Sequence, residues 1–197
     1  MCKKIAVTGG IGSGKSLVLQ CIQELGYPVF SCDEIYKEIS ETPQYLEKIK
    51  EVFPDCVHHN ALDRKKLSNI VFNDRTKLKK LNEISHPLIM NELYARMDQS
   101  NAKFVFAEVP LLFEAGLEKD FHETIYVKRN IEDRIQSVIL RDKTDRKSVE
   151  ERIRQQFDPD SVTGRKRMQN SNIHILENDA NIEKIKIYLN DLFTTIG

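Results

Sequence analysis

A glycine-rich segment near the start of the chain carries the residues best suited to chemistry. Residues 9–16 read Gly-Gly-Ile-Gly-Ser-Gly-Lys-Ser and satisfy the pattern G-x-x-x-x-G-K-[ST]. In this pattern the backbone N–H groups of small residues converge on a phosphate, a lysine reaches the β- and γ-phosphates, and a hydroxyl holds Mg²⁺. The segment therefore predicts a site for a nucleoside triphosphate.

The individual contacts follow from the same pattern. The loop backbone and the N-terminus of the next helix favour an anion, so the β-phosphate is expected there. Lys15 is expected to act as the catalytic cation that bridges β- and γ-oxygens, Ser16 to bind Mg²⁺, and the amide of Leu17 to meet the α-phosphate. The predicted nucleotide contacts in this segment are Gly10, Ile11, Gly12, Ser13, Gly14, Lys15, Ser16 and Leu17.

Two carboxylates further along the chain are candidates for the reaction itself. Asp33 follows an expected strand at the sheet edge where ligands of open α/β folds bind. It either orients and deprotonates an acceptor hydroxyl or caps the helix expected to start near Glu34. Glu108 ends another expected strand and either holds Mg²⁺ through water or is simply paired.

These side chains need a sheet to position them. Short buried strands are predicted at residues 4–8, 28–32, 103–109, 123–128 and 172–176, and a helix at 15–25. The intervening helical stretches are long enough for crossover connections between parallel strands. The fold class is therefore α/β, with five parallel strands and helices on both faces.

Two helical segments interrupt this alternation. Residues 34–98 carry no strand signal and predict helices at 34–40, 43–52, 64–72 and 74–97, the last bent near His86 and Pro87. Residues 130–168 are helical and rich in arginine, which suits a lid over phosphates. The expected domains are a nucleotide-binding core at 1–33, 99–129 and 169–197, an insertion at 34–98 and a lid at 130–168.

Composition limits the partners of this chain. Thirty basic residues balance thirty acidic ones, so no global field attracts nucleic acid or anionic lipid. No apolar run is long enough to cross a membrane, and no signal peptide is seen, so a cytoplasmic location is expected. Four isolated cysteines without a Cys-x-x-Cys pair favour free thiols, and a solvated loop is predicted around Cys56, His58 and His59. No obligate protein partner is evident.

Other classes with a phosphate-binding loop fit less well. A GTPase needs Asp-x-x-Gly and Asn-Lys-x-Asp, and neither pattern occurs. A transporter or motor ATPase would usually be larger. Small-molecule kinases need a closing lid that keeps water from taking the phosphoryl group, so an ATP-dependent kinase is favoured. A nucleoside or nucleotide kinase and a non-catalytic nucleotide sensor remain alternatives, and Asp33 argues against the sensor.

Several sequence blocks resemble the dephospho-coenzyme A kinase family, and the similarity runs along the whole chain. The most specific blocks are Thr-Gly-Gly-Ile-Gly-Ser-Gly-Lys-Ser at 8–16 and Val-Pro-Leu-Leu-Phe-Glu at 109–114. The remaining blocks are Asp33-Glu34-Ile35, Arg64-Lys65-Lys66-Leu67 with Val71-Phe72, His86-Pro87-Leu88-Ile89, Arg134 to Arg141-Asp142, Gln156 and Asn178-Asp179.

The resemblance implies a core, a helical domain for dephospho-coenzyme A and a lid. It implies that ATP phosphorylates the 3′-hydroxyl of the acceptor's ribose, with Mg²⁺ as cofactor and Asp33 as the base. The implied acceptor contacts are Thr8, Asp33, Arg64 and His86; the implied further ATP contacts are Arg141 and Asn178; Ser16 and Glu108 are the candidate metal ligands.

Some of these residues have simpler explanations. His86 could be a packed core histidine. Arg134 and Arg141 share a helix face, so they either aim at one polyphosphate or form solvated pairs with Asp133 or Asp142.

The sequence departs from the family at two positions. Ser31 stands where the family commonly has an acid, two residues before Asp33. Leu17 stands where the family often has threonine, so a hydroxyl is lost there while the backbone amide remains. Lys15, Ser16 and Asp33 are unchanged, and activity is still expected.

Overall fold

The computed structural model describes residues 2–72 and 74–197. The chain divides into two compact units, one formed by residues up to 30 together with 100–197, and the other by residues 31–99. Each unit has its own buried cluster of apolar side chains, and each is described separately below.

A parallel sheet forms the centre of the larger unit. Within the described residues it has five strands, in the order β2-β5-β1-β6-β7. The register pairs Val7 with Glu108 and Thr8 with Tyr126, so these neighbouring strands end close together. The predicted α/β class is confirmed, and the strands are β1 Lys3–Thr8, β2 Val29–Ser31, β5 Phe104–Glu108, β6 Glu123–Lys128 and β7 Ile173–Glu177.

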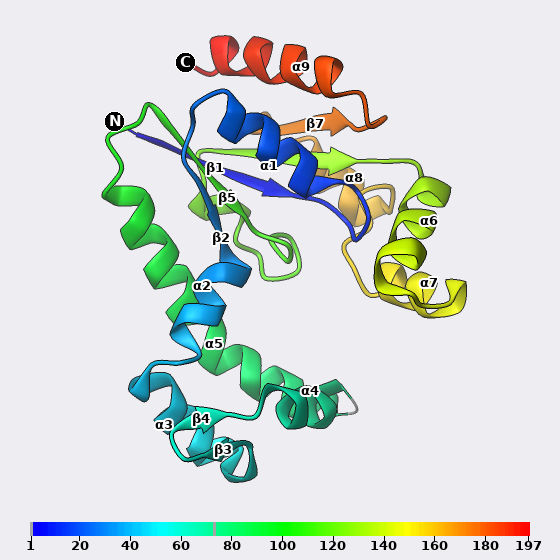
Figure 1. Ribbon diagram of the computed structural model, residues 1–197. Coiled ribbons are helices and arrows are strands. Elements are labelled where there is room, and N and C mark those ends of the chain that lie inside the picture. The colour runs from blue at the N-terminus through cyan, green and yellow to red at the C-terminus, as the bar shows by residue number, and fades with distance from the viewer. Residues whose placement is uncertain (1, 73) are drawn as a thin grey trace. The chain divides into compact units, whose positions relative to one another are not determined.

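Two helices cover one apolar surface of this sheet. Helix α1 (Lys15–Glu24) and helix α9 (Ile182–Thr195) pack against each other and share a buried cluster with the strands. Tyr27 contacts the rings of Phe104, Phe106 and Phe193 in edge-on or tilted arrangements. This packing anchors the N-terminus of α1, which begins directly after the glycine-rich loop (Figure 1).

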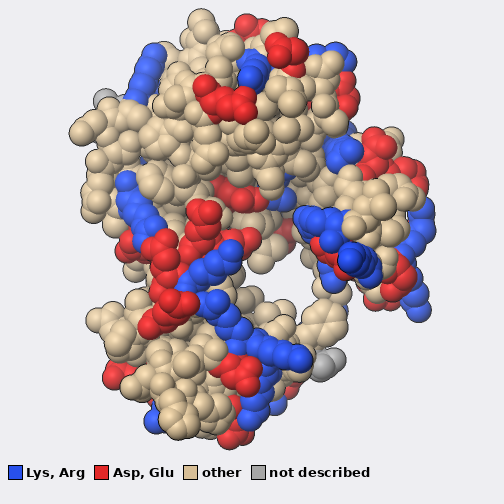
Figure 2. Space-filling view, viewed as in Figure 1, with Lys and Arg blue, Asp and Glu red and all other residues tan. Residues whose placement is uncertain are grey.

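The arginine-rich segment forms three helices. These are α6 Ile131–Asp142, α7 Arg146–Arg154 and α8 Val162–Met168. Helices α6 and α7 lie side by side (Figure 1) and bury Ile135, Val138 and Val149 between them. Ion pairs occupy many of the charged side chains on their outer surfaces, such as Arg146 with Glu132 and Arg152 with Asp142. Basic and acidic side chains are interspersed on the face seen in Figure 2.

The smaller unit is mostly helical, as predicted. It contains helices α2 Cys32–Ile39, α3 Pro43–Val52, α4 Arg64–Phe72 and α5 Arg75–Asp98, and a 3₁₀ turn at Pro54–Cys56. Helix α5 continues through Pro87, which removes one backbone donor from the helix. The core of the smaller unit surrounds Tyr45, which is fully buried and shares a hydrogen bond of 2.9 Å with Ser85.

Two predictions in this unit were wrong. Residues 34–98 do contain strands, β3 Val57–His58 and β4 Ala61–Leu62, which pair as an antiparallel hairpin. The turn residues His59 and Asn60 both have positive φ, as tight hairpin turns require, but the strands are too short to leave a periodic pattern. Cys56 is not in a solvated loop; its side chain is fully buried, and burial raises the pKa of its thiol.

No helix in the described part of the chain is both long and apolar enough to cross a lipid bilayer.

Candidate functional site

The glycine-rich loop connects the end of β1 to the start of α1. Gly12 and Gly14 have φ of 76° and 88°, a conformation that favours glycine. A Cβ on Gly14 would lie 2.1 Å from the Nδ2 atom of Asn178, and one on Gly12 would lie 2.5 Å from the carbonyl oxygen of Arg134. The loop is therefore closely packed on its outer side, which fixes the path of the backbone that the sequence pattern predicts for phosphate binding.

A small cavity of about 180 Å³ opens at the start of α1, and it brings several predicted site residues together. Lys15 and Ser16 lie on the helix, Glu108 comes from the end of β5, and Arg141 comes from the last turn of α6. The full lining is Gly12, Gly14, Lys15, Ser16, Glu108, Arg129, Ser137, Val138 and Arg141. The cavity thus combines cations, two serine hydroxyls and one carboxylate at the place predicted for a polyphosphate.

Two of the cations in this cavity have partners within the protein. The Nζ of Lys15 donates to the carbonyl of Gly9 at 3.0 Å, so the side chain folds back over the loop. Arg141 donates twice to Asp142, which also pairs with Arg152. The Arg141 hydrogen bond lowers the pKa of the Asp142 carboxyl. The predicted pair of Arg141 with Asp142 is therefore present, and Arg141 also lines the small cavity.

Asn178 and Leu17 were predicted to contact ATP, and both are engaged within the protein. The Asn178 side chain donates to the Ser13 carbonyl at 2.7 Å and accepts from the amide of Ala180 at 2.8 Å. The Leu17 amide donates to the Gly14 carbonyl at 3.0 Å, as the first turn of α1 forms. Their contacts with ATP stay predictions, and the geometry favours a role for Asn178 in supporting the loop.

Ile11 joins the glycine-rich loop to helix α6 and to the chain that follows helix α7. Its amide donates to the Oε1 of Gln156 at 2.8 Å, and its carbonyl accepts from the Nε of Arg134 at 3.0 Å. Its side chain packs against the cluster formed by Ile135, Val138 and Val149. Helix α6, through Arg134, and the segment that follows α7, through Gln156, are therefore attached to a single residue of the loop. Sequence reasoning gave Gln156 no role, because contacts 145 positions apart leave no local pattern.

The Gln156 contact leads to a testable expectation. Gln156→Met removes the acceptor for the Ile11 amide, and we expect the KM for ATP to rise about two- to tenfold, the range for one lost neutral hydrogen bond. Gln156→Glu keeps an acceptor and should stay closer to the parent protein. Gln155→Met, at the exposed neighbouring position, is the matched control. Equal ATP kinetics for Gln156→Met and Gln155→Met would contradict a role for the contact.

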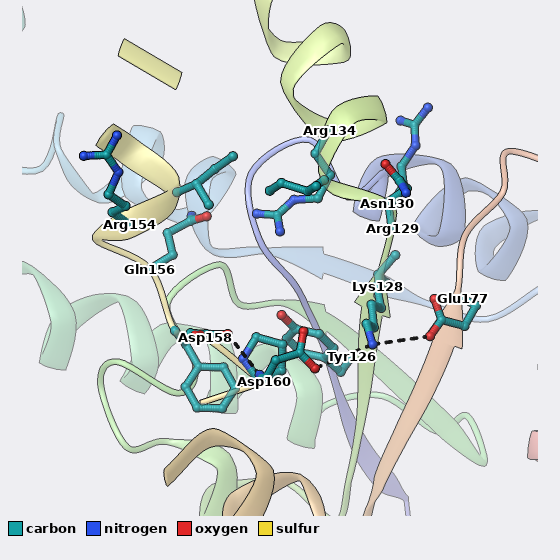
Figure 3. A pocket seen from close by; sticks show the side chains of 15 residues that line it. Tyr126, Lys128, Arg129, Asn130, Arg134, Arg154, Gln156, Asp158, Asp160 and Glu177 are labelled. Carbon is teal, nitrogen blue, oxygen red and sulfur yellow. Dashed lines mark hydrogen bonds and ion pairs between the residues drawn. The ribbon is translucent and has the colours of Figure 1, made fainter. Parts of the chain in front are cut away.

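A second, larger cavity of about 770 Å³ lies beside helices α6 and α7 (Figure 3). Arg134 points into it between Gln156 and Tyr126, while Lys128 pairs with Glu177 and Asp160 at its edge. Burial lowers the pKa of Arg134 and raises that of Tyr126 to about 12. The cavity has the size and the mixed polar and aromatic lining of small-molecule sites, and no pattern in the sequence predicted it.

Thr8, an expected acceptor contact, ends β1 and is 2% exposed. It lines a narrow crevice with Glu114, Phe113 and Tyr126. Glu114 accepts a hydrogen bond of 2.7 Å from the amide of Phe157, whose ring stacks on that of Phe113. The family-like block at 109–114 therefore holds the chain that leaves α7. Direct contact of Thr8 with an acceptor stays a prediction.

Asp33 is the second residue of α2 and is exposed to solvent. It is not the helix cap: Ser31 is the N-cap, and its Oγ accepts from the amide of Glu34 at 3.4 Å. The alternative that Asp33 serves as the cap is therefore wrong, because α2 begins two residues earlier than predicted. The carboxylate of Asp33 remains available for the predicted role as a base. Ser31, which replaces the acid common in the family, has a structural role here.

Arg64 and His86 also belong to the smaller unit. Arg64 donates to Ser40 at 2.8 Å and pairs with Glu41 at 3.1 Å. His86 lies on α5 and is half-buried, and desolvation lowers its pKa, so the neutral ring is favoured at neutral pH. Contacts of Arg64 and His86 with an acceptor stay predictions.

The oxygen atoms of the small cavity suit Mg²⁺. This ion prefers hard oxygen ligands and usually keeps several waters, binding through one or two protein groups and the substrate phosphates. Ser16 and Glu108 supply a hydroxyl and a carboxylate to the same cavity. No group of three or more His, Cys, Asp or Glu side chains suited to a metal occurs among the described residues. The donor set therefore fits a metal held mainly by a bound nucleotide.

Comparisons with known proteins agree with this description. The family model for dephospho-CoA kinase matches residues 3–184. A dephospho-CoA kinase from Fusobacterium nucleatum is 34% identical over 183 residues, with 92% of each chain covered. One from Thermus thermophilus is 35% identical over 182 residues, covering 92% of this chain and 86% of the relative. A crystal structure from Thermus thermophilus superposes with a TM-score of 0.82 and 32% identity, covering 99% and 98% of the two chains.

The parallel sheet, the glycine-rich loop and the helices beside it define a P-loop kinase. Within that class, the chain belongs to the dephospho-CoA kinase family. The resemblance seen in the sequence is therefore confirmed.

Proposed function

We propose that this protein transfers the γ-phosphoryl group of ATP to the ribose 3′-hydroxyl of dephospho-coenzyme A, giving coenzyme A and ADP. The observation that carries the proposal is the small cavity in which Lys15, Ser16, Glu108 and Arg141 meet at the glycine-rich loop. Together with the family membership, this cavity supports a triphosphate donor and the acceptor of that family.

Catalysis in this site depends on positioning and charge neutralisation, because phosphoryl transfer passes through a loose transition state. Lys15 neutralises charge that develops between the β- and γ-phosphates, and the loop amides and the N-terminus of α1 hold the β-phosphate. Ser16 and Glu108 would hold Mg²⁺, directly or through water. When bound, the ion supplies further positive charge to the phosphate oxygens.

The acceptor side of the site is assigned to residues of the smaller unit together with Thr8 of the larger unit. Asp33 orients the 3′-hydroxyl and takes its proton, and Arg64, His86 and Thr8 contribute to acceptor binding. We assign 34–98 to acceptor binding, 130–168 to the lid, and 1–33, 99–129 and 169–197 to the nucleotide-binding core. The proposed location is the cytoplasm, with ATP and dephospho-coenzyme A as small-molecule partners.

Substitution of Arg141 tests the proposed role of residues 130–168 as a lid. Its place in the phosphate cavity leads us to expect that Arg141→Ala raises the KM for ATP about tenfold, the size of one charge-assisted hydrogen bond. We also expect more ATP hydrolysis without acceptor, since a loosened lid admits water. Arg152→Ala is the matched control, because Arg152 pairs with the same Asp142 but lies outside the cavity. Unchanged kinetics for Arg141→Ala would remove this residue from the site.

The proposed reaction is tested with one assay. ADP release is measured with dephospho-coenzyme A, AMP and uridine as alternative acceptors, and the product is identified by mass. We expect efficient turnover only with dephospho-coenzyme A and phosphorylation at the 3′ position. Preference for AMP or uridine would instead identify a nucleotide or nucleoside kinase, and ATP binding without transfer to any acceptor would identify a sensor.

A further inference from the structure

Arg129 is a cation at the phosphate cavity that neither the sequence pattern nor the family resemblance assigned. It is the first residue after β6, next to Asn130, the N-cap of α6. Strand β6 pairs with β1, which leads into the glycine-rich loop, so the ends of both strands lie at one edge of the sheet. Arg129 also lines the larger cavity, at its edge; in Figure 3 its guanidinium extends away from Gln156 and Tyr126, whereas that of Arg134 lies between them.

The contacts of Arg129 hold its side chain without neutralising it. Its Nη1 donates to the Oγ of Ser137 at 2.9 Å and makes a longer contact of 3.4 Å with the carbonyl of Gly12. The Nε is buried, and no hydrogen-bond partner for it exists among the described residues. Both partners of Nη1 are uncharged, so the guanidinium is held in place but keeps its full positive charge.

Several arginines of residues 130–168 differ in this respect, although Arg134 and Arg165, like Arg129, have no carboxylate within 4.0 Å among the described residues. Carboxylate partners within 4.0 Å are present for Arg141, Arg146, Arg152, Arg154 and Arg167. In residues 2–72 and 74–197 Arg129 forms no such ion pair. A partly buried charge without a counterion costs free energy, and the cost is recovered when an anion binds beside it.

A triphosphate is the anion that this cavity is built to hold. Lys15, Arg129 and Arg141 line the same cavity of about 180 Å³, while Glu108 is its only carboxylate among the described residues. We propose that Arg129 binds a phosphate of ATP directly, with Ser137 holding the guanidinium in position. This inference rests on the proposed use of ATP as donor, and it adds a third cation from the protein to the phosphate site.

Two substitutions separate a charge that binds phosphate from a side chain that only supports the loop. Arg129→Gln keeps a polar side chain with an amide donor but removes the charge. Arg129→Lys keeps the charge but loses the planar guanidinium with its several N–H donors. The matched control is Arg165→Gln, an exposed arginine on α8 outside the cavity. The dissociation constant of MgATP is measured by calorimetry without acceptor, followed by steady-state kinetics.

We expect Arg129→Gln to weaken MgATP binding about tenfold or more, Arg129→Lys to recover much of the loss, and Arg165→Gln to match the parent protein. The difference between Arg129→Gln and the parent should shrink as KCl is raised, because salt screens an ionic contact. If Arg129 only supported the glycine-rich loop, the loss of MgATP affinity in Arg129→Gln would not depend on salt in this way. The KM for dephospho-coenzyme A should be unchanged.

Two results would overturn the inference: MgATP affinity of Arg129→Gln within twofold of the parent protein, or a loss in Arg129→Gln that Arg129→Lys does not reduce and salt does not change. Thermal melting of each variant shows whether it is folded. Binding of MgATP is measured without acceptor, so failure of the parent protein to phosphorylate dephospho-coenzyme A would reject the proposed function and still leave Arg129 testable.

Discussion

Lys15→Ala is expected to lower turnover by at least about 10²- to 10³-fold, while the protein stays folded. The substitution removes the cation that neutralises charge between the β- and γ-phosphates, and losses of this size follow when one preorganised electrostatic group is deleted. The Nζ atom of Lys15 donates to loop carbonyls at 3.0 and 3.4 Å and is only partly buried, so little stability depends on it.

The measurement is ADP release under saturating substrates, together with the thermal melting temperature. Lys186→Ala is the control, since Lys186 pairs with Glu24 at the other end of α1. A folded Lys15→Ala protein with near-normal turnover would reject the mechanism proposed for the glycine-rich loop.

Asp33→Asn has the second-largest expected effect. The substitution keeps the size of the side chain but removes its charge and its ability to accept a proton. If Asp33 is the base, turnover should fall about 10²-fold or more, with ATP binding and thermal stability little changed. Because the transition state is loose, an unchanged turnover with a much higher KM for the acceptor is the informative alternative. That result would make Asp33 an orienting group and reject it as the base.

Two neighbours of Asp33 provide the controls. Ser31→Ala removes the N-cap of α2 and should cost about 1 kcal/mol of stability without a large loss of turnover. Glu34→Gln neutralises the next carboxylate of the same helix turn and should leave turnover unchanged. Losses of equal size in Asp33→Asn and Glu34→Gln would indicate a general effect of charge near the helix N-terminus.

The sequence predicted the parts of this protein that local patterns encode. The loop at 9–16 was found because its spacing is required by phosphate binding, and the buried strands were found because they are short, apolar and separated by helical stretches. The bounds of α3 and α4 were predicted correctly, since Thr42 and Pro43 mark the start of α3 and the apolar spacing marks both helices.

Other features depend on contacts between distant positions. The hydrogen bonds of Asn178 with Ser13 and of Gln156 with Ile11 join segments more than 140 residues apart, and no spacing rule connects them. The start of α2 was misplaced because Ser31 and Asp33 are both good caps, and only the backbone geometry decides between them. The position of Arg141 on the helix did not show whether its side chain is paired with Asp142 or unpaired, and only the structure shows the ion pair.

Because Ile11 is attached to helices α6 and α7, we expect nucleotide affinity and the stability of these helices to be thermodynamically linked. A ligand that fixes the glycine-rich loop also fixes the residue on which α6 and α7 pack, so it should slow hydrogen–deuterium exchange in these helices. The coupling is reciprocal: the free energy by which bound ATP stabilises the α6–α7 pair equals the free energy by which the formed pair tightens ATP binding.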